Sequence, residues 1–192
     1  MLLVQGLRHS GADFEAFEAA REVVAAWPDN TEARTLFTAL ALEESDYEAV
    51  LSNSERLIEI EPVRIPLAYI WQGKALIGLD QFEEADEVLS VADEALAVRP
   101  DIDSWRSELC KVSVEVAEAE EDEVKTEERW EKCLQAFPVD QEMMTGAIEF
   151  FDEKGDRDRA TAVLENAIEL APRFLLARTQ LATRYAAELR FS

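Results

Sequence analysis

The chain has 192 residues, 48% of them hydrophobic, with 42 acidic and 19 basic residues and a formal net charge of −23. The hydrophobic content is sufficient for a buried core, and the low glycine and proline counts favour helices over sheets. Because the negative charge repels phosphate backbones and anionic lipid headgroups, we expect neither nucleic acid nor a membrane surface as a partner.

The spacing of the prolines predicts how the chain is organised. Five of the six prolines are separated by 34, 38, 38 and 34 residues, namely Pro28, Pro62, Pro100, Pro138 and Pro172. Periods in this range mark arrays of repeated supersecondary units. A second break precedes four of these prolines, at Ser10–Gly11, Ser45–Asp46, Gly78–Asp80 and Lys154–Asp156. Each repeat therefore consists of two helices.

Helices are expected on both sides of every break, because apolar residues there keep a period near 3.6. Proline ends each preceding helix, since it lacks the backbone N–H that the next turn requires, whereas Pro66 fits a first helical turn. We expect about eleven helices, over residues 2–9, 12–26, 31–44, 47–60, 66–78, 81–98, 103–120, 123–136, 140–153, 157–170 and 174–190.

The unit from Gln141 to Arg173 resembles the tetratricopeptide repeat (TPR) family. Its residues at the family's spacing are Ala147, Ile148, Phe151, Gly155, Ala160, Leu164, Ala167 and Pro172, and a second unit carries Tyr69, Gly73, Leu76, Phe82, Ala85, Leu89 and Ala92. The resemblance implies an all-α fold, a right-handed solenoid of antiparallel helix pairs. Asp80 replaces the usual turn glycine, Ser54 replaces a large apolar residue, and the two middle repeats are 38 residues long.

We expect one superhelical domain over 1–192, with repeats at about 1–30, 31–64, 65–102, 103–140 and 141–174 and a terminal helix at 174–190. That terminal helix is rich in apolar residues, although a terminal repeat usually turns a polar face to solvent. This pattern favours an excerpt from a longer array. The alternative is a capping helix whose second face is covered in a homo-oligomer.

Residues that could support catalysis or bind a metal are sparse. The only histidine is His9, the glycines do not form a phosphate-binding loop, and the acidic run from Glu118 to Glu128 lacks the ligand spacing of a calcium loop. We expect no enzyme activity, no cofactor and no metal site. Cys110 and Cys133 are expected to be buried, reduced thiols, although a disulfide between them is conceivable. With no signal or transmembrane segment visible, a cytoplasmic location is the default expectation.

Charged residues on the first helix of each pair predict a binding surface, because in the TPR family these helices line the concave inner surface. Helical spacing places one acidic group, Glu108, Glu115 and Glu118, beside a second group, Glu142, Glu149 and Asp152, with Thr145 nearby. The preceding repeat offers an apolar shelf of Ile70, Trp71 and Lys74. Ordinary solvation of an acidic protein is the competing explanation.

The resemblance implies a non-catalytic scaffold for protein–protein interaction. The Lys, Arg and Asn clamp with which a related family binds peptide carboxylates is absent, so we expect a protein or peptide partner that is basic or mixed basic-apolar. Arg173, Arg178, Arg184 and Arg190 make the terminal helix basic, which permits self-assembly through it. The alternatives are such a self-assembly module, or a TPR segment of a larger secretion, exopolysaccharide or enzyme-regulatory protein.

Overall fold

The computed structural model describes residues 2–60, 66–97 and 103–191, and all its regular structure in these ranges is helical. Eleven helices follow one another in the described part of the chain: α1 (Leu2–His9), α2 (Asp13–Ala26), α3 (Thr31–Glu43), α4 (Tyr47–Ile60), α5 (Pro66–Gly78), α6 (Phe82–Ala97), α7 (Asp103–Ala119), α8 (Glu123–Ala136), α9 (Gln141–Glu153), α10 (Arg157–Leu170) and α11 (Leu175–Phe191). The predicted helices are confirmed to within one residue at each described end. Pro62 and Pro100 lie outside the described residues.

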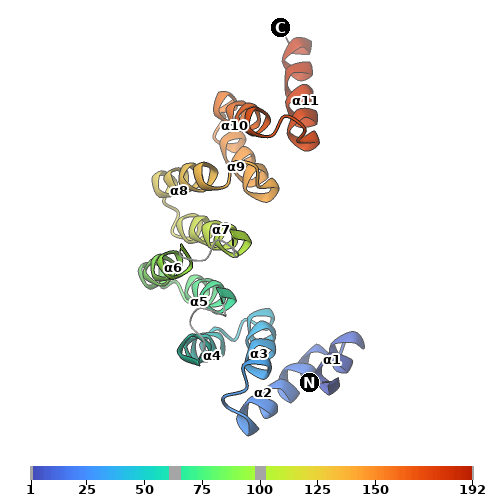
Figure 1. Ribbon diagram of the computed structural model, residues 1–192, viewed down its shortest axis with the longest axis vertical. Helices are drawn as coiled ribbons and strands as arrows, with labels where there is room; N and C mark the ends of the chain where they lie inside the picture. The colour runs from blue at the N-terminus through green and yellow to red at the C-terminus, as the bar shows by residue number, and fades with distance from the viewer. Residues whose placement is uncertain (1, 61–65, 98–102, 192) are drawn as a thin grey trace. The chain divides into compact units, whose positions relative to one another are not determined.

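The helices form two compact units, Met1–Asp122 and Glu123–Ser192. In the first unit each helix packs against the next, and α5 also contacts α3 and α7, so these three first helices lie side by side (Figure 1). In the second unit α8 packs on α9, α9 on α10 and α10 on α11. The expectation of one continuous domain over 1–192 stays a prediction.

The turns inside the helix pairs share one conformation. A single residue with positive φ ends the first helix of each pair, with φ of 74° at Gly11, 59° at Ser45, 57° at Asp80, 59° at Glu121 and 76° at Gly155. The next residue then donates its N–H five residues back, as Asp156 does to Phe151 O at 2.8 Å. This Schellman geometry satisfies the last helical carbonyls and reverses the chain. The predicted break at Asp80 is therefore a left-handed turn without glycine.

The turns between pairs are built on the spaced prolines. In each described one, the carbonyl of the residue before proline accepts an N–H three residues on, with N···O distances of 3.1 Å for Trp27 and Asn30 and 3.2 Å for Phe137 and Asp140. Asn30 and Asp140 then cap the next helix, since their side-chain oxygens accept the N–H groups of Ala33 and Met143. Proline thus ends one helix, and after Pro28 and Pro138 a polar residue two positions on begins the next, whereas Phe174 stands there after Pro172.

Small residues let the helices approach closely, as the sequence predicts. Gly73 on α5 lies so near α6 and α7 that an added Cβ would be 3.1 Å from Leu89 Cδ2 and 3.3 Å from Val112 Cγ1. Ala85 and Ala160 are fully buried. Ser54 is also fully buried, and its hydroxyl has no hydrogen-bond partner in the structure. These contacts fix the first helices, which carry the candidate binding residues.

Candidate partner-binding surfaces

The first candidate surface lies between α5 and α7 in the first unit. A shallow pocket of about 370 Å³ is lined there by Leu42, Leu67, Ile70, Trp71, Lys74, Trp105 and Glu108. We call it the α5–α7 groove. The structure thus brings four of the predicted residues together, Ile70, Trp71, Lys74 and Glu108. Ile70 and Trp71 are only 2% and 7% exposed, so the predicted apolar shelf is mostly core with a narrow solvent-facing edge.

The acidic residues of the α5–α7 groove are paired with the chain's own lysines. Lys74 Nζ lies 3.5 Å from Glu108 Oε1 and 3.7 Å from Glu115 Oε1, and Lys111 Nζ lies 2.5 Å from Glu108 Oε2. Partial burial opposes ionisation of Glu108, but Lys111 and Lys74 together hold its pKa below the usual value. Glu118 is exposed near the end of α7. This surface therefore carries mixed charge.

The second candidate surface lies between α9 and α11 in the second unit. Its pocket of about 930 Å³, the α9–α11 groove, includes Thr145, Ile148, Glu149 and Asp152 of α9 and Thr179, Gln180, Thr183, Arg184 and Ala187 of α11. Three predicted residues, Thr145, Glu149 and Asp152, line it together. Glu142 is exposed in the first turn of α9 and does not line this groove.

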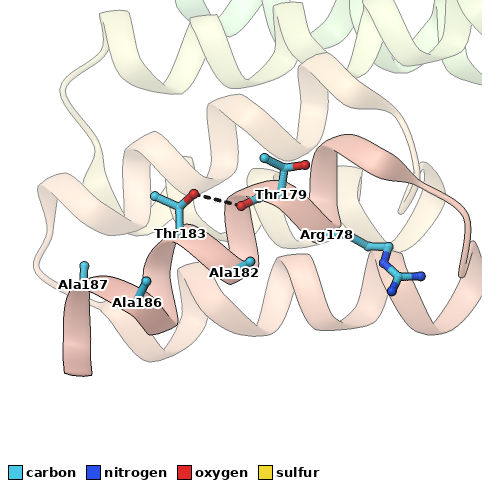
Figure 2. Close-up of a pocket in the computed structure, with 6 residues that line it drawn as sticks. All are labelled: Arg178, Thr179, Ala182, Thr183, Ala186 and Ala187. Carbon is cyan, nitrogen blue, oxygen red and sulfur yellow. Dashed lines mark hydrogen bonds between the residues drawn. The ribbon is translucent and has the colours of Figure 1, made fainter. Parts of the chain in front are cut away.

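The polar groups of the α9–α11 groove differ in how they are bonded. Arg184 forms an ion pair with Asp152, which ties α11 to α9. The hydroxyls of Thr145, Thr179 and Thr183 donate to carbonyls four residues back on their own helices, and Figure 2 shows the bond from Thr183 to Thr179. Glu149 is exposed and has no ion-pair partner within the described ranges, and Gln180 Oε1 is buried without a hydrogen-bond partner. Glu149 thus supplies a carboxylate that is available to a ligand, whereas Gln180 Oε1 is not accessible from solvent.

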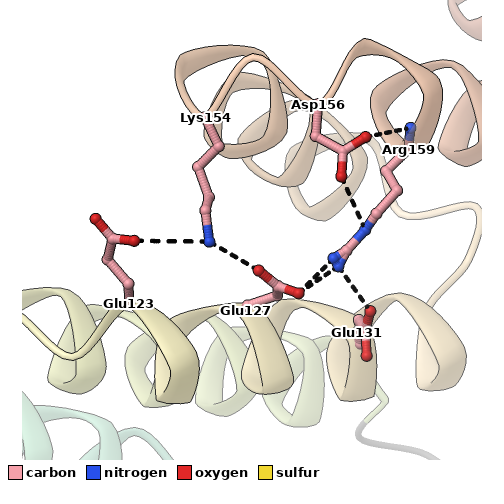
Figure 3. Close-up of polar contacts among 6 residues, drawn as sticks. All are labelled: Glu123, Glu127, Glu131, Lys154, Asp156 and Arg159. Atoms are coloured by element: carbon pink, nitrogen blue, oxygen red, sulfur yellow. Dashed lines mark hydrogen bonds and ion pairs between the residues drawn. The ribbon is translucent and has the colours of Figure 1, made fainter.

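Sequence reasoning missed an ion-pair network between α8 and the start of α10. Glu127 Oε2 accepts from Lys154 Nζ at 2.8 Å, Glu127 Oε1 from Arg159 at 2.5 Å, and Glu131 from Arg159 at 3.1 Å (Figure 3). Lys154 and Arg159 also lie over the rings of Phe150 and Phe151. The hydrogen bond from Lys154, with Arg159 beside it, holds the pKa of Glu127 below its usual value. The acidic run from Glu118 to Glu128 is thus partly bound to cations.

A sequence signal for these pairs does exist. Opposite charges joined between neighbouring repeats are separated by 35 residues in Arg8–Glu43, 34 in Lys74–Glu108, and 32 in both Arg159–Glu127 and Arg184–Asp152. This separation is close to the spacing of the prolines. Opposite charges about one repeat apart lie at similar heights on adjacent helices, which brings them within reach of one another.

The cysteines differ from expectation. Cys110 and Cys133 are both disulfide-bonded in the structure, so the expectation of two reduced thiols is wrong.

The helices were also compared with the requirements of a membrane span. None of those in the described part of the chain combines the length and the apolar character that such a span requires.

Solved structures with the same fold identify the architecture. The crystal structure of MamA is 19% identical over 88% of this chain and 94% of that chain, with a TM-score of 0.64. A thermophilic TPR protein of Thermus thermophilus is 20% identical over 95% of both chains, with a TM-score of 0.60. A TPR protein of Parabacteroides merdae is 18% identical over 92% of this chain and 70% of that one, with a TM-score of 0.64. No family model and no curated protein sequence matches the chain. The fold is therefore that of TPR proteins.

Proposed function

We propose that the chain is a non-catalytic scaffold that binds a segment of a partner protein along its first helices. The observation that carries the proposal is the α9–α11 groove, where predicted residues from α9 face small and polar residues from α11 around about 930 Å³ of open space. Grooves that combine apolar walls with a few polar groups are typical binding sites between helices. The TPR fold supports the proposal by analogy, since its helical pairs present extended binding surfaces.

The partner segment is basic or mixed basic-apolar. Glu149 supplies an exposed carboxylate without an ion-pair partner among the described residues, while Ile148 and Ala187 supply apolar surface beside it. The net charge of −23 attracts cationic segments over a longer range. Asp152 takes part only if a cation from the partner replaces Arg184.

The test uses a labelled peptide of alternating lysine and leucine residues and a twin in which glutamate replaces lysine. We expect fluorescence anisotropy to show binding of the lysine peptide, and Glu149→Lys to weaken it by about tenfold. Glu84→Lys is the matched control, because Glu84 is equally an exposed helical glutamate but lies on α6 of the first unit. Equal losses in both variants would mean that only the overall charge matters and would contradict the proposed site.

A further inference from the structure

The α11 helix exposes positions that are buried in α9. The two helices stand 34 residues apart, at the same distance from Pro138 and Pro172. In α9 the four positions are Met144, Ala147, Ile148 and Phe151, with exposures of 0%, 0%, 8% and 2%. Their equivalents in α11 are Arg178, Leu181, Ala182 and Tyr185, of which Leu181 is half-buried and the other three are exposed, Tyr185 by 42%. We call this set the open α11 face.

The burial of Phe151 in α9 has an identifiable cause, the second helix of its own pair. The second helix of the pair, α10, packs against α9, and Arg159 of α10 lies 4.5 Å from the ring centroid of Phe151. Tyr185 donates its hydroxyl to Glu165 Oε1 of α10 at 2.6 Å, whereas no helix in the described part of the chain covers the exposed Arg178 and Ala182. Arg178 and Ala182 instead help to line a shallow pocket of about 620 Å³ whose described lining comes from α11 alone (Figure 2). The repeat itself therefore indicates that a helix fits on this face.

Arginine at the position of Arg178 occurs in α3 as well, where the covering helix is present. Arg34 also stands six residues after its proline, and its guanidinium donates to the carbonyl of Pro28 and, at 2.6 Å, to Oδ1 of Asn53 on α4. Arg178 keeps the first of these bonds, since its Nη1 donates to Pro172 O at 3.1 Å. Arg178 has no side-chain acceptor among the described residues. Helix α4, which covers α3, thus supplies a side-chain acceptor of the kind that Arg178 lacks among the described residues.

We propose that the open α11 face docks an amphipathic helix of a partner protein. Apolar side chains of that helix pack against Leu181, Ala182 and Tyr185, and a carboxylate accepts from Arg178 as Asn53 accepts from Arg34. A carboxylate fits better than an amide because Arg173, also exposed, has no carboxylate partner in the described ranges, and charge-assisted bonds to guanidinium are the stronger ones. Leu175, 75% exposed, extends the apolar surface. The pocket on this face shares Thr179, Thr183 and Ala187 with the α9–α11 groove, but Arg178 and Ala182 line only the pocket on the open α11 face, and the ligand proposed there carries the opposite charge.

The test uses two synthetic helical peptides with the same apolar face of leucine and alanine, one with glutamate and the other with lysine beside that face. We expect the intact chain to bind the glutamate peptide at least about tenfold more tightly than the lysine peptide in fluorescence anisotropy. Ala182→Arg should abolish binding of the glutamate peptide, because a long charged side chain would occupy the contact. Arg178→Glu should reverse the preference between the peptides.

A matched control separates docking from a general charge effect. Ala25→Arg makes the same change at an exposed helical alanine of α2 and should leave the affinity unchanged. Absence of binding, equal affinity for both peptides, or insensitivity to Ala182→Arg would overturn the proposal, and the last readout holds even if Arg178→Glu fails to fold. Light scattering adds a further outcome: a dimer that Ala182→Arg disrupts would mean that a second copy covers this face, which also overturns docking of a partner helix.

Discussion

The α5–α7 groove and the α9–α11 groove are built from equivalent helices but use their charges differently. Lys74 lies between Glu108 and Glu115, so the cation of the first groove is bound on both sides by its own chain. In the second groove only Asp152 is paired, with Arg184, and Glu149 has no ion-pair partner within the described ranges. Lys74 and Arg184 both stand twelve residues after a spaced proline. One position thus serves to join first helices in both units, and only the second groove leaves a carboxylate for a ligand.

The largest expected difference in stability concerns Gly73 on α5 and Gly146 on α9, two of the helices that form the grooves. A Cβ at Gly146 would lie 2.5 Å from Cη2 of the buried Trp130, whereas one at Gly73 would lie 3.1 Å from a methyl group of Leu89 and 3.3 Å from one of Val112, so smaller shifts would relieve the contact. We expect Gly146→Ala to lower the free energy of unfolding by about 1–3 kcal/mol despite its better helix propensity. Gly73→Ala should change it by less than about 1 kcal/mol. Urea denaturation measures both, and equal effects would contradict the packing difference.

The turns give the next largest effect. Gly155 of the second unit and Glu121 of the first both end helices at positive φ, 76° and 59°. Gly155→Ala should therefore destabilise the chain by about 1–2 kcal/mol, since a Cβ is unfavourable in that conformation. Glu121→Gly should stabilise it by up to about 1 kcal/mol, because relief of that strain exceeds the cost of glycine's flexibility. Thermal unfolding of both variants checks the opposite signs; two changes of the same sign would be inconsistent with this geometry.

Smaller effects are expected from removing the cations of the two grooves. Lys74→Met removes the cation shared by Glu108 and Glu115, of which Glu108 keeps Lys111, whereas Arg184→Met removes the cation of Asp152 alone. Partly exposed pairs contribute modestly, so we expect losses of about 1 kcal/mol for Lys74→Met and about 0.5 kcal/mol for Arg184→Met. A double-mutant cycle with Glu108→Gln isolates the Lys74 contribution. High salt should reduce the coupling, and a coupling of zero at low salt would show that the pair is only incidental.

The smallest effect is a pH dependence. The pKa of Glu108 in the folded chain is lower than its usual value, because Lys111 and Lys74 together outweigh the effect of its partial burial. Its contribution to stability is therefore present above the unfolded-state pKa and is lost as the pH falls through the folded-state pKa. Glu108→Gln should make the free energy of unfolding less dependent on pH in this acidic range while changing it little below. An unchanged pH profile for the variant would mean that the ion pairs do not form in solution.

Most of the fold could be predicted from the chain itself, because its determinants are local. Pro28, Pro138 and Pro172 each follow the end of a helix that they prevent from continuing, and Asn30 and Asp140 cap the helices that follow. The left-handed turn at Asp80 was located as a break although its residue is not glycine. These features depend on a few neighbouring residues, so their spacing in the sequence is enough to place them.

The candidate site could be predicted only in part. Helical spacing correctly put Thr145, Glu149 and Asp152 on one side of α9, where they line a single groove. It could not indicate that Trp71 would be 7% exposed or that Glu127 would be bound by Lys154 and Arg159. A helical period gives the direction of a side chain relative to its own axis, but not the position of the neighbouring helix.

The sequence by itself determined the period, the helix pairs and the faces on which acids gather, since propensity, capping and periodicity act within a few residues. Only the tertiary structure decided which carboxylates remain available. Glu108 is paired and Glu149 is not because the approach of successive helices, set by residues such as Gly73, determines whether a lysine or arginine can reach. Pairing across a groove depends on distances between helices, and those distances arise from packing.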